Sequence, residues 1–304
     1  MIKKIGFVIV TLLFVAIAWY LFVKPSDYII TFKVKTTPGT VIQSIKSWNS
    51  NLSASKITEK HGTSAIVQER QFGDSTVTYT YHAYTLNDSI TKVSVGIKDA
   101  DHSLINRLTV PFSKTLFKAR SDANVMEFLE ALSEHLKRIK IEITGIEKTP
   151  STYCAYIPLK SDQEGKALGM MRNYGYIGDV LSRNNVELNG PPFVEITEWN
   201  QEMDSISYNF CFPIIRSENL PITEDIKYKR LFEKDAIHAV YNGNYITSDR
   251  AWYALLAYAK RNNIEVDTKP LEVFFNNPNM GGNELEWKAD IYMPLKQESP
   301  VQVD

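Results

Sequence analysis

The feature that most constrains the fold is a six-residue segment that occurs twice in the second half of the chain, as RNNVEL at 183–188 and as RNNIEV at 261–266. Each copy follows an amphipathic helical stretch and precedes a strand marked by proline. A chance match would not bring the same order of elements with it. The sequence therefore predicts a strand-helix-strand-strand unit used twice, at 145–215 and 235–296.

The second copy carries a set of motifs with recognisable spacing. In order along the chain these are Gly243-Asn244-Tyr245, Trp252 on a helix, Pro270-Leu271-Glu272-Val273-Phe274, Asn277-Pro278 and Tyr292-Met293-Pro294. The segment from 145 to 296 resembles the GyrI-like (AraC-type) effector-binding domain, in which such motifs recur. It departs from the family pattern in two turns, at Gly243-Asn244 and at Asn276-Asn277.

The resemblance implies a groove between the two repeats that binds varied small molecules, often aromatic and cationic, through a central glutamate and aromatic residues. Glu272 is at the position of that glutamate. The two-residue period of a strand places Glu272 and Phe274 on one face. We expect the helix after Asp249 to cover the other face, of Leu271, Val273 and Phe275, so that Glu272 lies unpaired in the groove.

Each of these candidates also has an ordinary structural interpretation. Glu272 could be a solvated strand residue or could pair with a lysine such as Lys288, and Trp252 could belong to the core. Tyr245 and Tyr156 lie near strand ends, where their hydroxyls could face the groove or satisfy buried carbonyls. Glu195 is the repeat-related carboxylate, offset by one residue, and is a secondary candidate.

The chain begins with an uninterrupted apolar run, Ile5 to Val23, without a charged residue. Nineteen helical residues span about 28 Å, which matches the hydrocarbon thickness of a bilayer. The run ends in Trp19-Tyr20 without a small-residue cleavage site, which favours a retained transmembrane anchor over a cleaved signal peptide. Lys3 and Lys4 favour a cytoplasmic amino terminus and extracytoplasmic, periplasmic domains.

The segment after the apolar run alternates like a half-buried strand at 28–34 and then begins a helix near Pro38. Strands follow at 76–83 and 92–98, and a helix opening at Ser121 or Asp122 closes the segment. This order resembles the START-like (SRPBCC) helix-grip fold, which implies a deep apolar cavity under the last helix. The expected class is thus α+β: an anchor at 1–26, a START-like domain at 27–142, a GyrI-like domain at 145–296 and a tail at 297–304.

Composition narrows the function further. The net charge is −1, from 34 Lys+Arg and 35 Asp+Glu, which gives no electrostatic case for a nucleic-acid partner. The five histidines and two cysteines form no metal-binding spacing, and the P-loop, G-x-G-x-x-G and G-x-S-x-G motifs are absent. We therefore expect no cofactor and no metal.

The sequence favours a membrane-anchored protein that binds an amphipathic, possibly cationic aromatic, small molecule. Two alternatives stay open at this point. In the first, the protein is a hydrolase in which Glu272 is the general base and Tyr245 a proton donor. In the second, it is a scaffold whose cavities are filled by its own side chains.

Overall fold

The computed structural model describes residues 2–87 and 90–296, so the expected tail at 297–304 lies outside the described residues. The chain divides into two compact units, Met1–Ser133 and Glu134–Asp304. Strand β6 (Lys140–Lys148) pairs into the sheet of the second unit. We describe each unit by itself.

The amino-terminal segment forms a helix, α1 (Ile2–Ala18), which continues as one turn of π-helix, η1 (Trp19–Val23). The stretch Lys4–Val23 is long and apolar enough to cross a membrane, a property that it shares with signal sequences. None of this stretch is fully buried inside the described part of the protein: the side chains of residues 4–17 are exposed, and Ala18, Tyr20 and Leu21 near its carboxy-terminal end are half-buried.

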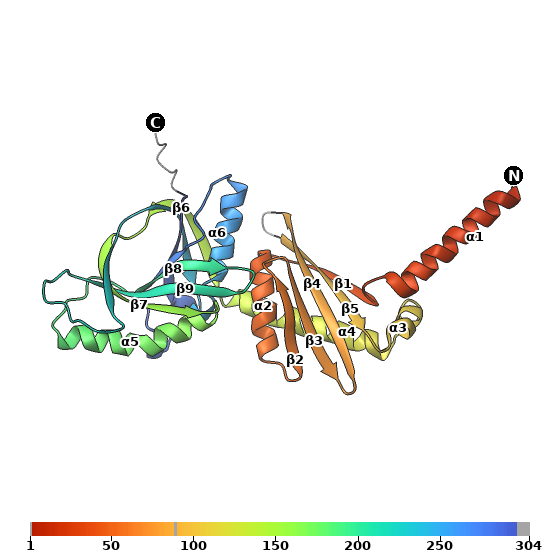
Figure 1. Ribbon diagram of the computed structural model, residues 1–304, viewed down its shortest axis with the longest axis horizontal. Coiled ribbons are helices and arrows are strands. Elements are labelled where there is room, and N and C mark those ends of the chain that lie inside the picture. The colour runs from red at the N-terminus through yellow and green to blue at the C-terminus, as the bar shows by residue number, and fades with distance from the viewer. Residues whose placement is uncertain (1, 88–89, 297–304) are drawn as a thin grey trace. The chain divides into compact units, whose positions relative to one another are not determined.

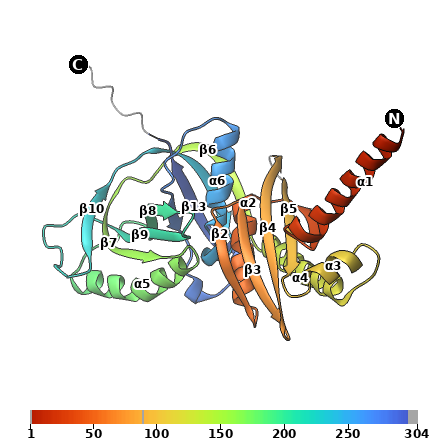
Figure 2. The same cartoon turned by 45° about the vertical axis from the view of Figure 1, so that its right-hand side comes forward.

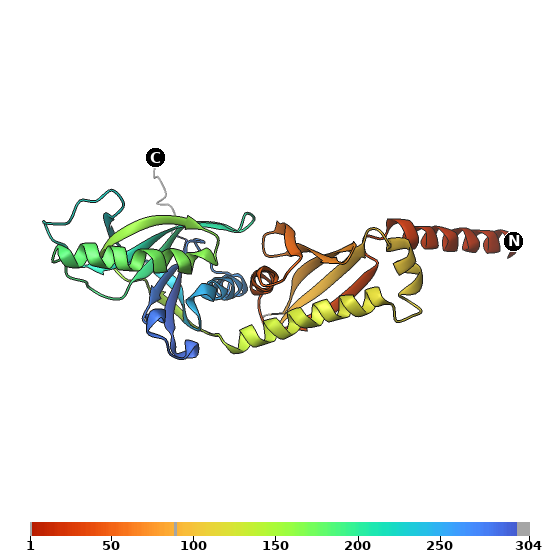
Figure 3. The ribbon, with the colours of Figure 1, turned by 90° about the horizontal axis from the view of Figure 1, so that it is seen from below.

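The first unit is built on a five-stranded antiparallel sheet in the order β1-β5-β4-β3-β2 (Figure 1). Its strands are β1 (Tyr28–Val34), β2 (Ser55–His61), β3 (Ala65–Phe72), β4 (Ser75–Asn87) and β5 (Ile90–Asp99). Three helices accompany the sheet: α2 (Pro38–Ser50), α3 (Ser103–Thr109) and α4 (Leu116–Lys137). Figure 3 shows α4 running along one face of the sheet.

Helix α4 begins at Leu116, five residues before the start expected at Ser121. The reason is a cap that lies before the apolar stripe, since the Thr115 hydroxyl accepts a hydrogen bond from the Lys118 amide at 3.1 Å. The sequence pattern also did not predict the short helix α3.

Aromatic rings occupy the space between the sheet and the middle of α4. The ring centroid of Phe128 lies 5.9 Å from Tyr81, 5.5 Å from Trp48 and 6.3 Å from Phe32. A pocket of about 260 Å³ lies instead near the start of α4, where Tyr79, Phe117 and Ser121 are among its lining residues. The rings of Phe128 and its three aromatic neighbours fill the space between α4 and the sheet around Phe128.

The second unit is built on an eight-stranded sheet in the order β10-β7-β9-β8-β12-β13-β11-β6. The further strands are β7 (Thr152–Ser161), β8 (Phe193–Asn200), β9 (Ser205–Ile214), β10 (Lys227–Leu231), β11 (Asp235–Asn242), β12 (Leu271–Phe274) and β13 (Lys288–Pro294). Two long helices, α5 (Gly165–Arg183) and α6 (Arg250–Arg261), and three short turns of 3₁₀-helix, η2 (Tyr245–Thr247), η3 (Pro278–Met280) and η4 (Glu284–Glu286), complete it. Figure 2 shows β10 beside β7 at one edge of this sheet.

The two copies of the RNN segment end their helices in the same way. Asn185 and Asn263 have φ of 55° and 54°, the left-handed conformation in which asparagine is favoured. The amide of the next residue returns to the helix in both copies, from Val186 to Leu181 and from Ile264 to Ala259, at 2.9 Å each. Identical residues at 183–185 and 261–263 thus form equivalent turns.

Candidate functional site

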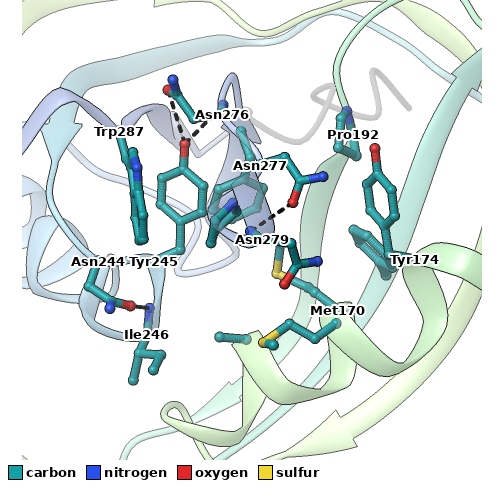
Figure 4. A pocket seen from close by; sticks show the side chains of 15 residues that line it. Met170, Tyr174, Pro192, Asn244, Tyr245, Ile246, Asn276, Asn277, Asn279 and Trp287 are labelled. Atoms are coloured by element: carbon teal, nitrogen blue, oxygen red, sulfur yellow. Dashed lines mark hydrogen bonds between the residues drawn. The ribbon is translucent and has the colours of Figure 1, made fainter. Parts of the chain in front are cut away.

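A pocket of about 260 Å³ opens in the second unit, beside α5 (Figure 4). Its lining comes from both of the segments predicted as repeats. The lining residues are Ala167, Met170, Met171, Tyr174, Pro192, Phe210, Asn244, Tyr245, Ile246, Phe274, Asn276, Asn277, Pro278, Asn279 and Trp287. All fifteen belong to the described part of the chain, and none carries a charge. The pocket is a mainly apolar cavity whose polar side-chain groups are two tyrosine hydroxyls, one indole N–H and four side-chain amides.

One wall of the pocket is a face of α5. Ala167, Met170, Met171 and Tyr174 recur at the i, i+3, i+4, i+7 spacing that places side chains on one side of a helix. Gly169 lies within this stretch, where a Cβ would overlap the hydroxyl of the buried Tyr208. A glycine here therefore allows α5 to approach the sheet closely.

The facing wall contains three aromatic residues. The Tyr245 ring lies 4.7 Å from Phe274 and 6.0 Å from Trp287, measured between centroids. Its hydroxyl donates to the carbonyl of Lys288 at 2.7 Å and accepts from the amide of Asn276 at 3.1 Å. Burial raises the pKa of Tyr245 to about 12. This hydroxyl therefore holds the turn at the pocket rim in place.

Glu272 is not among the residues that line the pocket, and it has no exposed surface. Its carboxylate accepts hydrogen bonds from the Lys166 ammonium, from the Trp252 indole at 2.5 Å and from the Ser248 hydroxyl at 3.1 Å. The Lys166 ammonium also donates to Ser248 at 2.8 Å. The expectation of an unpaired carboxylate is wrong, because a lysine of α5 neutralises it.

The partner of Glu272 is also not the lysine that the sequence suggested. Lys288 pairs with Asp290 at 3.1 Å, whereas Lys166 comes from a helix 106 residues earlier in the chain. The ammonium of Lys166 lies 4.7 Å from the centroid of the Trp252 ring, a cation–π geometry. A carboxylate and an aromatic ring thus surround a cation that the protein itself supplies.

Helix α6 covers the opposite strand face from the one expected. Trp252 of this helix bonds Glu272, so α6 packs on the face of Glu272 and Phe274, and Leu271 and Val273 join a separate cluster on the other side. The apolar stripe of α6 contains a polar contact, since the indole N–H points at a carboxylate. Trp252 is fully buried, as its core interpretation expected.

Glu195 and Tyr156 lie on the other face of the sheet. Glu195 is paired in register with Leu271, and adjacent paired residues share a face. Its carboxylate accepts from Lys229 and from the Asn209 amide at 2.7 Å, and the Lys229 ammonium lies 4.9 Å from the Tyr156 ring. The one-residue offset from Glu272 reverses the face, because side chains alternate along a strand.

Of the six candidates, the structure thus brings Tyr245 and Phe274 to the pocket, whereas Glu272 and Trp252 are fully buried and do not line it. Glu195 lines a second pocket of about 240 Å³. The carboxylate of Glu272 offers nothing in favour of the general-base alternative, because water has no access to it. Among residues 2–87 and 90–296, no cluster of three or more His, Cys, Asp or Glu side chains could hold a metal ion.

Sequence reasoning missed the α5 wall and Lys166. The spacing of Ala167, Met170, Met171 and Tyr174 was a usable signal, since it marks an apolar helix face with two methionines. The lysine gave no such signal, because no local pattern relates residues 166 and 272.

The fold and this pocket define a small-molecule binding module. Residues 144–296, half of the chain, match the family described as GyrI-like small molecule binding domain, and the chain belongs to this family. No curated protein matches the chain.

Several solved structures are similar to the chain. The C-terminal domain of EcmrR has 13% identity and a TM-score of 0.43, over 53% of this chain and 99% of that chain. SAV2435 bound to tetraphenylphosphonium has 16% identity and a TM-score of 0.37, over 51% and 94%. A hydrolase from Listeria innocua has 13% identity and a TM-score of 0.33, over 50% and 92%.

Proposed function

We propose that this protein binds uncharged aromatic or amphipathic small molecules in the pocket beside α5, and that its apolar amino-terminal helix anchors it in a membrane. The observation that carries the ligand class is the absence of charge from the fifteen described lining residues, combined with the neutralisation of Glu272 by Lys166. The volume of about 260 Å³ is near the lower end for small-molecule sites.

The rim of the pocket supplies the polar contacts in this proposal. Asn244, Asn276 and Asn277 line it and occupy the two turns in which the sequence departs from the family pattern. The Asn244 side chain already accepts from the Ile246 amide and donates to Glu284, so Asn276 and Asn277 carry the amides that a ligand would meet. A side-chain amide both donates and accepts hydrogen bonds, so it suits carbonyl, ether or hydroxyl groups of a neutral ligand. The departures therefore favour a ligand with hydrogen-bonding groups at its edge.

The cationic ligands allowed by the sequence are less suited to this pocket. Glu272 would attract a cation only if its charge were unopposed, and the ammonium of Lys166 already bonds it. Aromatic rings still give weak cation–π attraction, of about 0.5–1 kcal/mol at exposed sites. We therefore expect a neutral compound to bind more tightly than a cation of the same shape.

Two tyrosines on α5 provide a matched test. Tyr174 lines the pocket and is 40% exposed, whereas Tyr176 is 41% exposed and does not line it. Calorimetric titration would compare triphenylphosphine oxide with the methyltriphenylphosphonium cation, which has the same three phenyl rings and a methyl group in place of the oxygen. We expect the neutral compound to bind more tightly, and Tyr174→Ala to weaken it about tenfold, or about 1.4 kcal/mol.

Tyr176→Ala should leave both affinities unchanged. Equal losses in the two tyrosine variants would contradict the pocket assignment. A preference for the phosphonium would contradict the ligand class but leave the pocket itself standing.

The membrane anchor is supported by contacts at its carboxy-terminal end. Arg107 of α3 donates to the carbonyls of Leu21 at 2.9 Å and Lys24 at 2.6 Å, so the last turn of the apolar segment is bonded to the folded unit. Removal of residues 5–23 would deprive this buried arginine of two of its acceptors, the carbonyls of Tyr20 and Leu21. Intact mass measurement of membrane-extracted protein tests this, with loss of the segment as the contrary result.

We further propose an extracytoplasmic location for both units, with the amino terminus in the cytoplasm. Lys3 and Lys4 before the span support this orientation. Ser53 is exposed in the turn after α2, so Ser53→Cys should react with an impermeant maleimide in intact cells. Labelling only after lysis would indicate the opposite topology.

Two finer features of the fold belong to the same proposal. The first unit is START-like in the order of its sheet, its early helix α2 and its long helix α4. The second unit is a duplication, supported by the equivalent Asn185 and Asn263 turns and by a strand order that mirrors itself about the β8–β12 pair. The expected boundaries at 26, 142 and 296 stay predictions.

A further inference from the structure

The end of the apolar helix is joined to α3 by a dense set of polar contacts. Arg107 bonds the carbonyls of Tyr20, Leu21 and Lys24 and pairs with the buried carboxylate of Asp27 at 2.8 Å. The Tyr20 hydroxyl donates back to the Arg107 carbonyl at 3.2 Å. Figures 1 and 3 show α3 beside the carboxy-terminal end of α1 and η1. No flexible linker separates the apolar helix from the first unit.

An exposed apolar surface surrounds this junction. We call it the α3 patch and define it by Leu104, Ile105, Leu108, Phe112 and Leu116, all of which are exposed. Phe112 is the extreme case, with 89% of its surface accessible. The three residues of the helix itself occupy an arc of about 100°, since successive helical residues are rotated by that angle. Leu104, Ile105 and Leu108 therefore share one side of α3, while Phe112 lies in the loop that follows and Leu116 is the first residue of α4.

Charge in the same segment has a single sign. Residues 103–121 contain Arg107, Lys114, Lys118 and Arg120 and no acidic residue. Arg107 is buried in the junction, whereas Lys114 and Arg120 are exposed. Basic side chains around exposed apolar ones suit a surface of anionic lipid head groups, which attract lysine and arginine while the apolar side chains enter the acyl boundary.

We propose that the α3 patch lies in the membrane interface, beside the point where the apolar helix leaves the bilayer. The junction fixes the position of the patch, because a transmembrane helix ends at head-group level and α3 is bonded to its last turn. Trp19 and Tyr20 in that turn are the residue types that are enriched at this level. This inference rests on the proposed membrane anchor and adds a second, peripheral contact between the first unit and lipid.

Depth-dependent quenching in nanodiscs tests the proposal on the full-length chain. Phe112→Cys carries an environment-sensitive fluorophore, and the disc contains phosphatidylcholine and phosphatidylglycerol with a nitroxide on a shallow acyl position. Ser53→Cys is the matched control, because Ser53 is exposed and Figures 1 and 3 place α2, which leads to it, on the side of this unit away from α1. Unmutated protein gives the background, since Cys154 and Cys211 are buried.

We expect quenching at position 112 to exceed that at position 53 by at least threefold, and to weaken when phosphatidylglycerol is left out. A second labelled variant, Leu116→Cys, repeats the measurement if Phe112→Cys does not fold. Equal quenching at the patch and at Ser53, in protein that co-elutes with the discs, would overturn the docking and leave the anchor intact. Failure of the full-length chain to enter the discs would overturn the anchor and the docking together.

Discussion

The pair formed by Lys166 and Glu272 is the residue-scale feature with the largest consequence. Both side chains are fully buried, and each has lost its water. Breaking such a pair from one side leaves a charge without a partner, which costs more than the pair itself contributes. The two opposite charges therefore cancel at this buried position, and the stability of the fold depends on keeping both side chains.

Lys166→Met tests this dependence. We expect a loss of about 3–5 kcal/mol in the free energy of unfolding at pH 7, because Glu272 would be left buried and uncompensated. The double variant Lys166→Met/Glu272→Gln should recover part of that loss, since no charge remains. Urea unfolding of the two variants and the wild type measures both values. A double variant as unstable as the single one would show that the lysine acts by packing alone.

Gly169 provides a second residue-scale prediction. Gly169→Ala would drive a methyl group into the Tyr208 hydroxyl, and we expect a loss of about 1–3 kcal/mol from overpacking. Gly175 on the same helix has open space where a Cβ would lie, so Gly175→Ala should stabilise the helix by up to about 1 kcal/mol. Thermal unfolding compares the two, and a neutral Gly169→Ala would mean that α5 shifts away from the sheet.

At the residue scale, the sequence predicted which side chains share a strand face better than it predicted which side chains bond one another. The alternation of β12 correctly placed Glu272 and Phe274 on one face, because strand geometry is local. The interaction that determines the state of Glu272 joins residues 106 positions apart, and only the fold brings them together. The expectation that α6 covers the face of Leu271 and Val273 was wrong for the same reason. The stripe of α6 has an apolar pattern, and nothing local shows that the Trp252 N–H bonds Glu272.

At the scale of elements, a histidine connects three neighbouring strands of the second sheet. His238 of β11 lies 3.1 Å from the Glu147 carboxylate of β6 and 3.4 Å from the Asp290 carboxylate of β13. Its ring also stacks on Tyr292, with centroids 4.6 Å apart. Burial alone would lower the pKa of His238, but the hydrogen bonds and charges of Asp290 and Glu147 outweigh it and raise the pKa above 6.5.

This raised pKa predicts how stability varies with pH. A histidine with a higher pKa in the folded state contributes stability that is fully present below its unfolded pKa of about 6.5 and is lost as pH rises through the folded value. We expect the wild-type urea midpoint to fall between pH 6 and pH 8 by more than that of His238→Gln. If the urea midpoints of the two proteins changed equally with pH, His238 would not be the source of the pH dependence of stability.

Elements were predicted where their pattern is local and strong. The strand at 28–34 and the two amphipathic helices before the RNN segments are of this kind. The start of α4 was misplaced because a threonine cap precedes its apolar stripe. Strand β10 has five residues and helix α3 has seven, so each element is too short to be identified from the periodicity of its apolar residues.

At the scale of the whole molecule, the contacts of Arg107 determine how tightly the first unit follows its apolar helix. A planar guanidinium carries five N–H donors in a fixed geometry, so Arg107 bonds three carbonyls and a carboxylate at once, whereas an ammonium has only three N–H donors on a flexible chain. The sequence predicted the helix and the unit after it but not this connection, because nothing local marks Arg107 as a partner of residues 20–24.

Arg107→Lys should therefore loosen the connection while keeping a positive charge beside Asp27. In nanodiscs, we expect the fluorescence anisotropy of a label on Ser53→Cys to decay faster in this variant, since the unit would rotate independently of the disc. Arg120→Lys, at an exposed arginine of the same unit, is the control. Identical decays in all three proteins would show that the junction does not restrain the unit.

The two walls of the pocket differ in mechanical character. Met170 and Met171 have unbranched thioether chains that can change rotamer at little cost, while Tyr245 is held at its hydroxyl by two backbone groups. One wall can thus adapt its shape, and the other keeps its shape. Ligands of different outline should be accepted as long as each presents a flat surface to the rigid side. Oxidation of the methionines to sulfoxides would make the adaptable wall polar, so the range of accepted compounds should narrow under oxidising conditions.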